Sequence, residues 1–135
     1  MTEPVVTATL LNGLLGHLRR WLANLARARP SRREQSVEAL RNVVRAARET
    51  AVYVRQLKAT ERPDHERERI LSLRWTDLAF ELRRLGMEAL AKRCDIKGRE
   101  WADPEQFEAE FLARAGVRLD ELEKQARVLL RRVEG

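Results

Sequence analysis

The stretch that decides the fold is residues 71–94, LSLRWTDLAFELRRLGMEALAKRC. Its large apolar side chains recur at alternating steps of four and three residues: Leu71, Trp75, Leu78, Leu82, Leu85 and Ala89. This spacing places them on one side of an α-helix, and its persistence over several turns is typical of a heptad seam. We therefore expect a long amphipathic helix from about residue 65 to residue 94.

The same stretch carries a second row of apolar side chains on the opposite side of the expected helix. The members of this seven-residue row are Leu73, Phe80, Met87 and Cys94. A helix that is apolar on both sides must be buried on both sides. The cover is a second copy of the chain, the segment around residues 101–111, or a different protein. Of these, we favour a second copy of the chain, so we expect the row to be the interface of a homo-oligomer.

Helical spacing also describes the chain on either side. Upstream, an apolar stripe runs through Leu11, Leu14, Leu18, Leu22 and Leu25. Arg29-Pro30 should end this first helix, because a residue before proline is pushed out of the α region. Ser31 and Glu34 have the spacing of a capping box, which predicts a second helix over 32–59. Asp64 is the expected N-cap of the next helix.

Downstream of Cys94, residues 96–102 are expected to form a polar connection, and Asp103-Pro104 to begin the last helical segment. That segment is either one kinked helix or two shorter helices divided near Gly116, and we favour the break. Four helical segments joined by short turns predict an all-α fold, an antiparallel up-down-up-down four-helix bundle. We expect residues 1–135 to form a single domain.

Patterns typical of catalysis or metal binding are missing from the sequence. His17 and His65 have no His or Cys partner at the spacing of a helical metal site. The single cysteine, Cys94, excludes an internal disulfide and a Cys-based zinc cluster. No glycine-rich phosphate loop follows a strand, because no segment has the pattern of a strand. We expect a non-enzymatic protein with no cofactor and no metal site.

Positive charge is concentrated in the N-terminal half. The chain has 27 Lys and Arg, only four of them lysine, against 21 Asp and Glu. Residues 1–60 hold eleven basic and four acidic residues, whereas residues 61–135 hold 16 and 17. Arg41, Arg45, Arg48 and Arg55, the four-arginine row, fall within an arc of about 80° along about 21 Å of helix. Arg20 and Arg27 lie opposite the leucine stripe of the first helix.

An arginine surface of this kind suits phosphate groups, so we expect these six arginines to contact the backbone of nucleic acid. The alternatives are an acidic protein surface as the partner, or a protein-interaction adaptor whose arginines serve solubility and reflect codon usage. The uncharged run from residue 4 to residue 18 is shorter than the roughly 18 residues that span a bilayer. We therefore expect a cytoplasmic protein that does not bind membranes.

Overall fold

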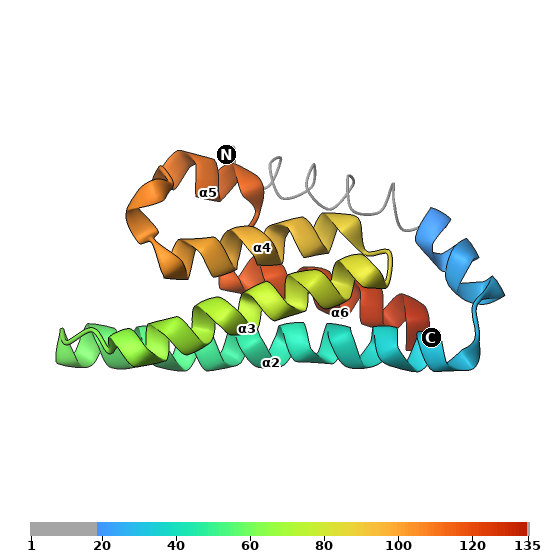
Figure 1. The fold of residues 1–135 in the computed structure, drawn as a ribbon, viewed down its shortest axis with the longest axis horizontal. Coiled ribbons are helices and arrows are strands. Elements are labelled where there is room, and N and C mark those ends of the chain that lie inside the picture. The colour runs from blue at the N-terminus through green and yellow to red at the C-terminus, as the bar shows by residue number, and fades with distance from the viewer. Residues whose placement is uncertain (1–18, 135) are drawn as a thin grey trace.

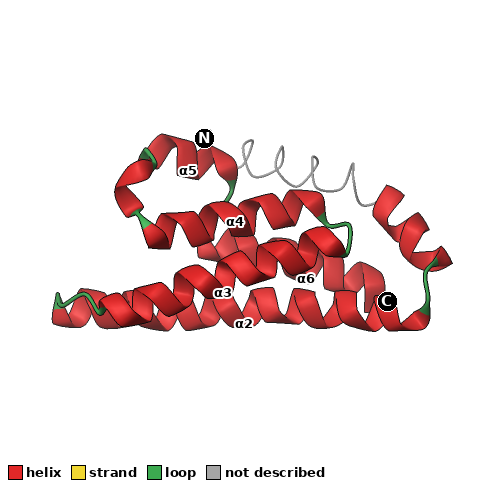
Figure 2. Cartoon of the chain, in the orientation of Figure 1, coloured by secondary structure: helices red, strands yellow, loops and turns green. Residues whose placement is uncertain are grey.

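The computed structural model describes residues 19–134, and within them every regular element is a helix (Figures 1 and 2). Residues 19–27 are helical, and a 3₁₀ turn, η1, spans Pro104–Gln106. The remaining helices are α2 (Pro30–Thr60), α3 (His65–Arg84), α4 (Glu88–Ala102), α5 (Ala109–Ala115) and α6 (Leu119–Glu134). The predicted all-α class is confirmed.

Helix α2 runs along the whole molecule and carries two antiparallel neighbours (Figure 1). Its 31 residues extend about 46 Å at the rise of an α-helix. Against α3, the Trp75 indole donates to the Thr50 hydroxyl at 3.0 Å. Against α6, the Arg33 guanidinium donates to the Val133 carbonyl, and Arg48 pairs with Glu123 farther along α2. The apolar core lies where α2, α3, α4 and α6 face one another.

The predicted single helix over 65–94 is wrong, because α3 and α4 are two helices that fold back on each other. Gly86 has φ +87°. The Gly86 amide donates to the Arg83 carbonyl at 3.0 Å, and the Met87 amide donates to the Leu82 carbonyl at 2.9 Å. These two bonds form a Schellman motif, in which a glycine in a left-handed conformation ends the helix. The heptad pattern continues in the sequence, but the backbone reverses direction.

The predicted polar connection over 96–102 is also wrong, since α4 continues through it to Ala102. Gly98 is buried against α3, where the Ser72 hydroxyl donates to the Gly98 carbonyl at 2.8 Å. A Cβ at Gly98 would lie 2.5 Å from Oγ1 of Thr76 and 2.9 Å from the Ser72 carbonyl oxygen. The glycine therefore serves close helix packing here, not a turn.

The break near Gly116 is confirmed. Gly116 lies between α5 and α6 and has φ +70°, and the next residue, Val117, is only 1% exposed. The start of this segment differs from the prediction, because Asp103 ends α4 and precedes a 3₁₀ turn without a side-chain capping bond. The breaks at Gly86 and Gly116 return α4 along α3 and α6 along α2, and α5 lies beside α4 (Figure 1).

Two further predictions concern the N-terminal part. The capping box at Ser31 is wrong: α2 begins two residues earlier, with Arg29 as N-cap, Pro30 at the first position and no side-chain capping bond. Of the first predicted helix, Leu11, Leu14, His17 and Leu18 lie outside the described residues. Since the third predicted helix is two helices, the up-down-up-down bundle of four long segments is not confirmed.

Candidate functional site

The four-arginine row lies exposed on α2, but most of it is paired with carboxylates. Arg41 contacts Glu134 at 3.0 Å, and Arg48 contacts Glu123 at 3.3 Å, both across to α6. Arg45 contacts Glu38 on α2 itself at 2.8 Å. Arg55 makes no ion pair with any residue from 19 to 134. Exposed pairs of this kind contribute about 0–1 kcal/mol to stability, but each carboxylate offsets the local positive potential.

A denser cluster of positive charge lies just before this row, in residues 19–33, which we call the acid-free segment. It contains no Asp or Glu. All six of its arginines are exposed, and none makes an ion pair within the described part of the chain. They are Arg19, Arg20, Arg27, Arg29, Arg32 and Arg33. Only two of them, Arg20 and Arg27, are among the predicted contacts, although the lack of acidic residues between Glu3 and Glu34 is a signal for all six.

Two arginines of the acid-free segment have a structural role at helix ends. The Arg32 guanidinium donates to the Arg84 carbonyl at 3.4 Å, at the end of α3. Arg33 donates to the Val133 carbonyl at the end of α6. The C-terminus of a helix carries partial negative charge, which a guanidinium offsets. Arg19, Arg20, Arg27 and Arg29 make no such contact in the described chain, so their charge is open to a ligand.

The acid-free segment is held in place by Trp21. Its indole nitrogen donates to the Leu85 carbonyl at 3.1 Å, and the Trp21 side chain is 7% exposed. Leu25, one turn later, is also buried. Helix 19–27 therefore lies against the turn between α3 and α4, at the end of the molecule where α2 begins and α6 ends (Figure 1).

The seven-residue apolar row is divided between two helices and two environments. Leu73 and Phe80 lie on α3 and are 49% and 64% exposed. Met87 and Cys94 belong to the apolar core of the chain itself, at 5% and 0% exposure, so their assignment to an interface is wrong. The reversal at Gly86 is the cause, because α4 no longer continues the register of α3. Burial raises the pKa of the Cys94 thiol and leaves it protonated.

A groove of about 830 Å³ lies between α4 and α5. Four of its lining side chains are basic and one, Glu88, is acidic. Its lining residues are Arg83, Glu88, Ala89, Lys92, Arg93, Ile96, Phe111, Arg114 and Ala115. No sequence pattern indicates this α4–α5 groove, because it forms only where α5 folds back beside α4. A groove of about 670 Å³ between α2 and α3 is lined instead by both signs of charge.

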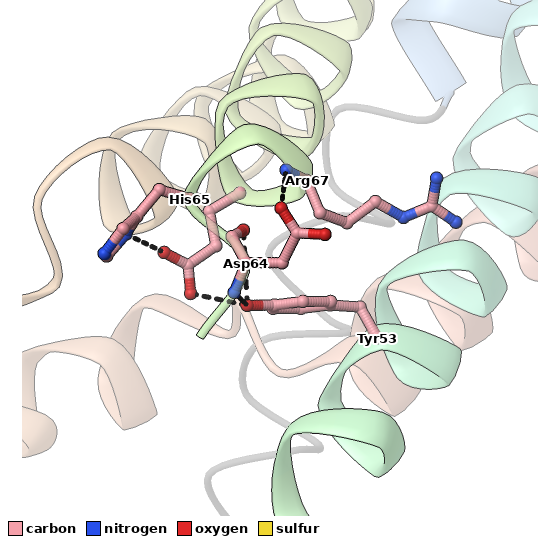
Figure 3. Close-up of polar contacts among 5 residues, drawn as sticks. Tyr53, Asp64, His65 and Arg67 are labelled. Atoms are coloured by element: carbon pink, nitrogen blue, oxygen red, sulfur yellow. Dashed lines mark hydrogen bonds and ion pairs between the residues drawn. The ribbon is translucent and has the colours of Figure 1, made fainter. Parts of the chain in front are cut away.

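A cluster of polar side chains closes the turn between α2 and α3 (Figure 3). The buried Tyr53 hydroxyl accepts from the Asp64 amide at 2.9 Å and donates to the Glu68 carboxylate at 2.8 Å. His65 contacts the same carboxylate at 3.3 Å. His65 is therefore part of the first turn of α3, which Asp64 caps as predicted. Burial raises the pKa of Tyr53, with a further contribution from Glu68.

In the described ranges, no group of three or more His, Cys, Asp or Glu side chains is placed to hold a metal ion. No helix among residues 19–134 has the length and apolar content needed to cross a membrane. Comparisons with protein families, with curated proteins and with solved structures found no match to this chain.

Proposed function

We propose that this chain is a non-enzymatic protein that binds the phosphate backbone of nucleic acid, with the acid-free segment as its main contact. The observation that carries the proposal is the set of six exposed arginines in residues 19–33, with no carboxylate among them and no ion pair in the described chain. The planar guanidinium forms two parallel hydrogen bonds with a phosphate, which lysine cannot do.

We propose the four-arginine row of α2 as a secondary contact with the phosphate backbone. Arg41, Arg45 and Arg48 would have to leave a carboxylate before they could bind a phosphate. Arg55 has no such pair to break. Contacts made by these residues and by Arg20 and Arg27 read no bases, so binding should depend little on sequence and strongly on salt.

The test compares arginines of the acid-free segment with paired arginines elsewhere. One variant carries Arg20→Gln and Arg27→Gln. The matched control carries Arg69→Gln and Arg74→Gln, which remove the same charge from α3, where both arginines pair with glutamates. Affinity for a labelled duplex is measured between about 50 and 200 mM salt. We expect the first variant to lower the slope of log affinity against log salt by about 1.8, at about 0.9 per phosphate contact.

The control should leave the duplex affinity and its salt slope near those of the unaltered chain. Equal losses in the two variants would show that only total charge matters, and the acid-free segment would then not be the contact. Binding that is absent at about 50 mM salt, or that ignores salt, would contradict the function itself.

A second candidate function is favoured by α3. Leu73 and Phe80 lie seven residues apart on its outer side and remain exposed, so this face suits assembly with a second copy or with a partner protein. Light scattering over a range of protein concentrations tests whether a second copy of the chain binds this face. A homo-oligomer should dissociate when Phe80 is changed to Asp. A chain that stays monomeric at every concentration would contradict self-association through α3.

A further inference from the structure

The α4–α5 groove has positive charge that the described chain does not neutralise. Glu88, its one acidic lining residue, pairs with Arg83 at 3.6 Å. Lys92 and Arg114 make no ion pair with any residue from 19 to 134. Two unpaired positive groups are therefore left at the groove, and both are exposed. An anionic group that enters it would find cations without first displacing a carboxylate.

Arg93 adds a fixed, partly desolvated charge to the same groove. It is half-buried, and its guanidinium donates to the Gln125 side chain at 3.3 Å. Burial lowers the pKa of Arg93, and the nearby Glu121 carboxylate works against that shift. A guanidinium held in less water than a surface arginine interacts more strongly with an incoming anion.

Flat groups stack in series toward the groove. The Arg99 guanidinium lies 5.3 Å above the ring centre of Phe107. Phe107 and Phe111 are stacked with ring centres 5.4 Å apart and an angle of 9° between their planes. Phe111 is the last member of this series; it lines the groove and is 39% exposed. A further planar ring could therefore stack on Phe111 from within the groove.

The size of the groove fits one such ligand unit. Its volume of about 830 Å³ is within the range of about 300–1,000 Å³ found for small-molecule sites. The apolar lining of Ala89, Ile96 and Ala115 suits the uncharged part of the ligand. A ligand with a flat ring at one end and a phosphate at the other matches the unpaired positive charge, the exposed Phe111 ring and the volume of the groove.

We propose that the α4–α5 groove binds a nucleotide, with its base stacked on Phe111 and its phosphate at Lys92 and Arg114. The inference deepens the proposed function and rests on it, because it assigns a preference for single strands to a protein that otherwise reads only phosphates. Bases inside a duplex are stacked on one another and cannot enter the groove. Base–aromatic stacking is the usual way in which proteins hold single strands without reading their sequence.

The test measures binding of labelled oligo(dT) of about twelve nucleotides and of a duplex of equal length, with thymidine monophosphate as competitor. Phe111→Leu keeps an apolar side chain but removes the flat ring. We expect it to weaken oligo(dT) binding about tenfold and to leave duplex binding unchanged. Lys92→Gln with Arg114→Gln should lower the salt slope for oligo(dT) by about 0.7, the value for one phosphate on a single strand, because both side chains contact the same phosphate.

Matched controls are Phe80→Leu, which removes an exposed ring from α3, and Arg69→Gln with Lys124→Gln, which removes the same two charges elsewhere. Helicity and thermal midpoint of each variant establish that it is folded. Competition by thymidine monophosphate would identify a free nucleotide as a ligand, and binding of the oligonucleotide alone would identify the strand.

Three results would overturn the inference. The first is equal oligo(dT) affinity in Phe111→Leu and Phe80→Leu, with duplex binding intact, which leaves the proposed function standing. The second is competition by polyglutamate as effective as that by oligo(dT), which would make the groove a site for acidic peptides. The third is that neither oligo(dT) nor the duplex binds in a salt-dependent way, which would contradict the proposed function as well as the nucleotide site in the groove.

Discussion

At the start of α3, the Asp64 carboxylate accepts a hydrogen bond from the Arg67 amide at 3.0 Å. This bond satisfies one of the amides that have no partner within the first turn of a helix. Glu66 and Glu68 in the same turn add negative charge where the helix dipole favours it. At the start of α2, Ser31 makes no capping bond, because it is already the second residue of the helix and the N-cap position belongs to Arg29.

These two helix starts give the first prediction. Asp64→Ala should lower the free energy of unfolding by about 1 kcal/mol through the lost cap. Ser31→Ala should change it by less than about 0.5 kcal/mol, as expected for an exposed side chain without such a contact. Urea denaturation of the two variants measures both values. Equal losses would mean that Ser31 caps α2 after all.

The second prediction concerns Tyr53, the only tyrosine of the chain. Burial disfavours its phenolate, so the folded protein keeps the phenol proton to a higher pH than the unfolded chain does. The stability from this difference is fully present below the ordinary pKa of 10.0 and is lost as the pH rises through the folded value. Absorbance at the phenolate band against pH should show a midpoint above that in denaturant. Coincident midpoints would contradict the burial of the hydroxyl.

At the scale of elements, the packing of α4 on α3 depends on Gly98. Alanine is normally better in a helix than glycine by about 1 kcal/mol. At Gly98, however, a Cβ would meet backbone oxygen of α3 at 2.9 Å, which a side-chain rotation cannot relieve. We therefore expect Gly98→Ala to lower the free energy of unfolding by about 1–3 kcal/mol, the range typical of overpacking. A variant as stable as the unaltered chain would contradict this close approach.

The turn between α3 and α4 depends on Gly86 for a different reason. A Cβ there would meet its nearest neighbour, the Trp21 ring, at 3.5 Å, so space is not the constraint. The φ of +87° is the constraint, because residues with a Cβ rarely adopt it. Gly86→Ala should cost about 1–2 kcal/mol of stability, whereas Gly86→Asn should cost less, since asparagine tolerates left-handed backbone. Thermal unfolding ranks the two variants, and the reverse order would contradict the argument.

At the scale of the whole molecule, Trp21 joins the acid-free segment to the rest of the chain. Trp21→Ala would remove a buried ring and its hydrogen bond to the Leu85 carbonyl. We expect a loss of about 3–5 kcal/mol in stability, as for other buried tryptophans. Cleavage by trypsin after Arg20 and Arg27 should become faster at the same time, because helix 19–27 loses its attachment. Unchanged cleavage would show that other contacts hold this helix.

The positions where helices stop were predictable in part. Thr60–Asp64 and Gly116 combine turn residues with an interruption of the apolar pattern, so local sequence indicated both. Gly86 escaped notice because apolar residues continue at helical spacing across it. Gly98 was predicted to lie in a polar connection between helices, although here the missing side chain serves contact with α3. A lone glycine has the same local signature in both roles, and only the neighbouring helix distinguishes them.

The candidate site was predictable to a similar extent. The charge of residues 19–33 can be counted in the sequence, and Arg20 and Arg27 were selected from it. The pairing of Arg41 with Glu134 and of Arg48 with Glu123 joins residues far apart in the chain, so no local pattern indicates it. Phe111 and Lys92 likewise come together only because α5 returns to α4.

Sequence alone determined that the chain is helical and rich in arginine toward its N-terminus, because apolar periodicity and charge are local properties of the chain. Tertiary structure decided which arginines are neutralised, why Met87 and Cys94 are buried while Leu73 and Phe80 are not, and where a basic groove forms. These outcomes depend on how helices separated by turns pack against one another. A single glycine with positive φ redirects a whole helix and thereby changes every contact beyond it.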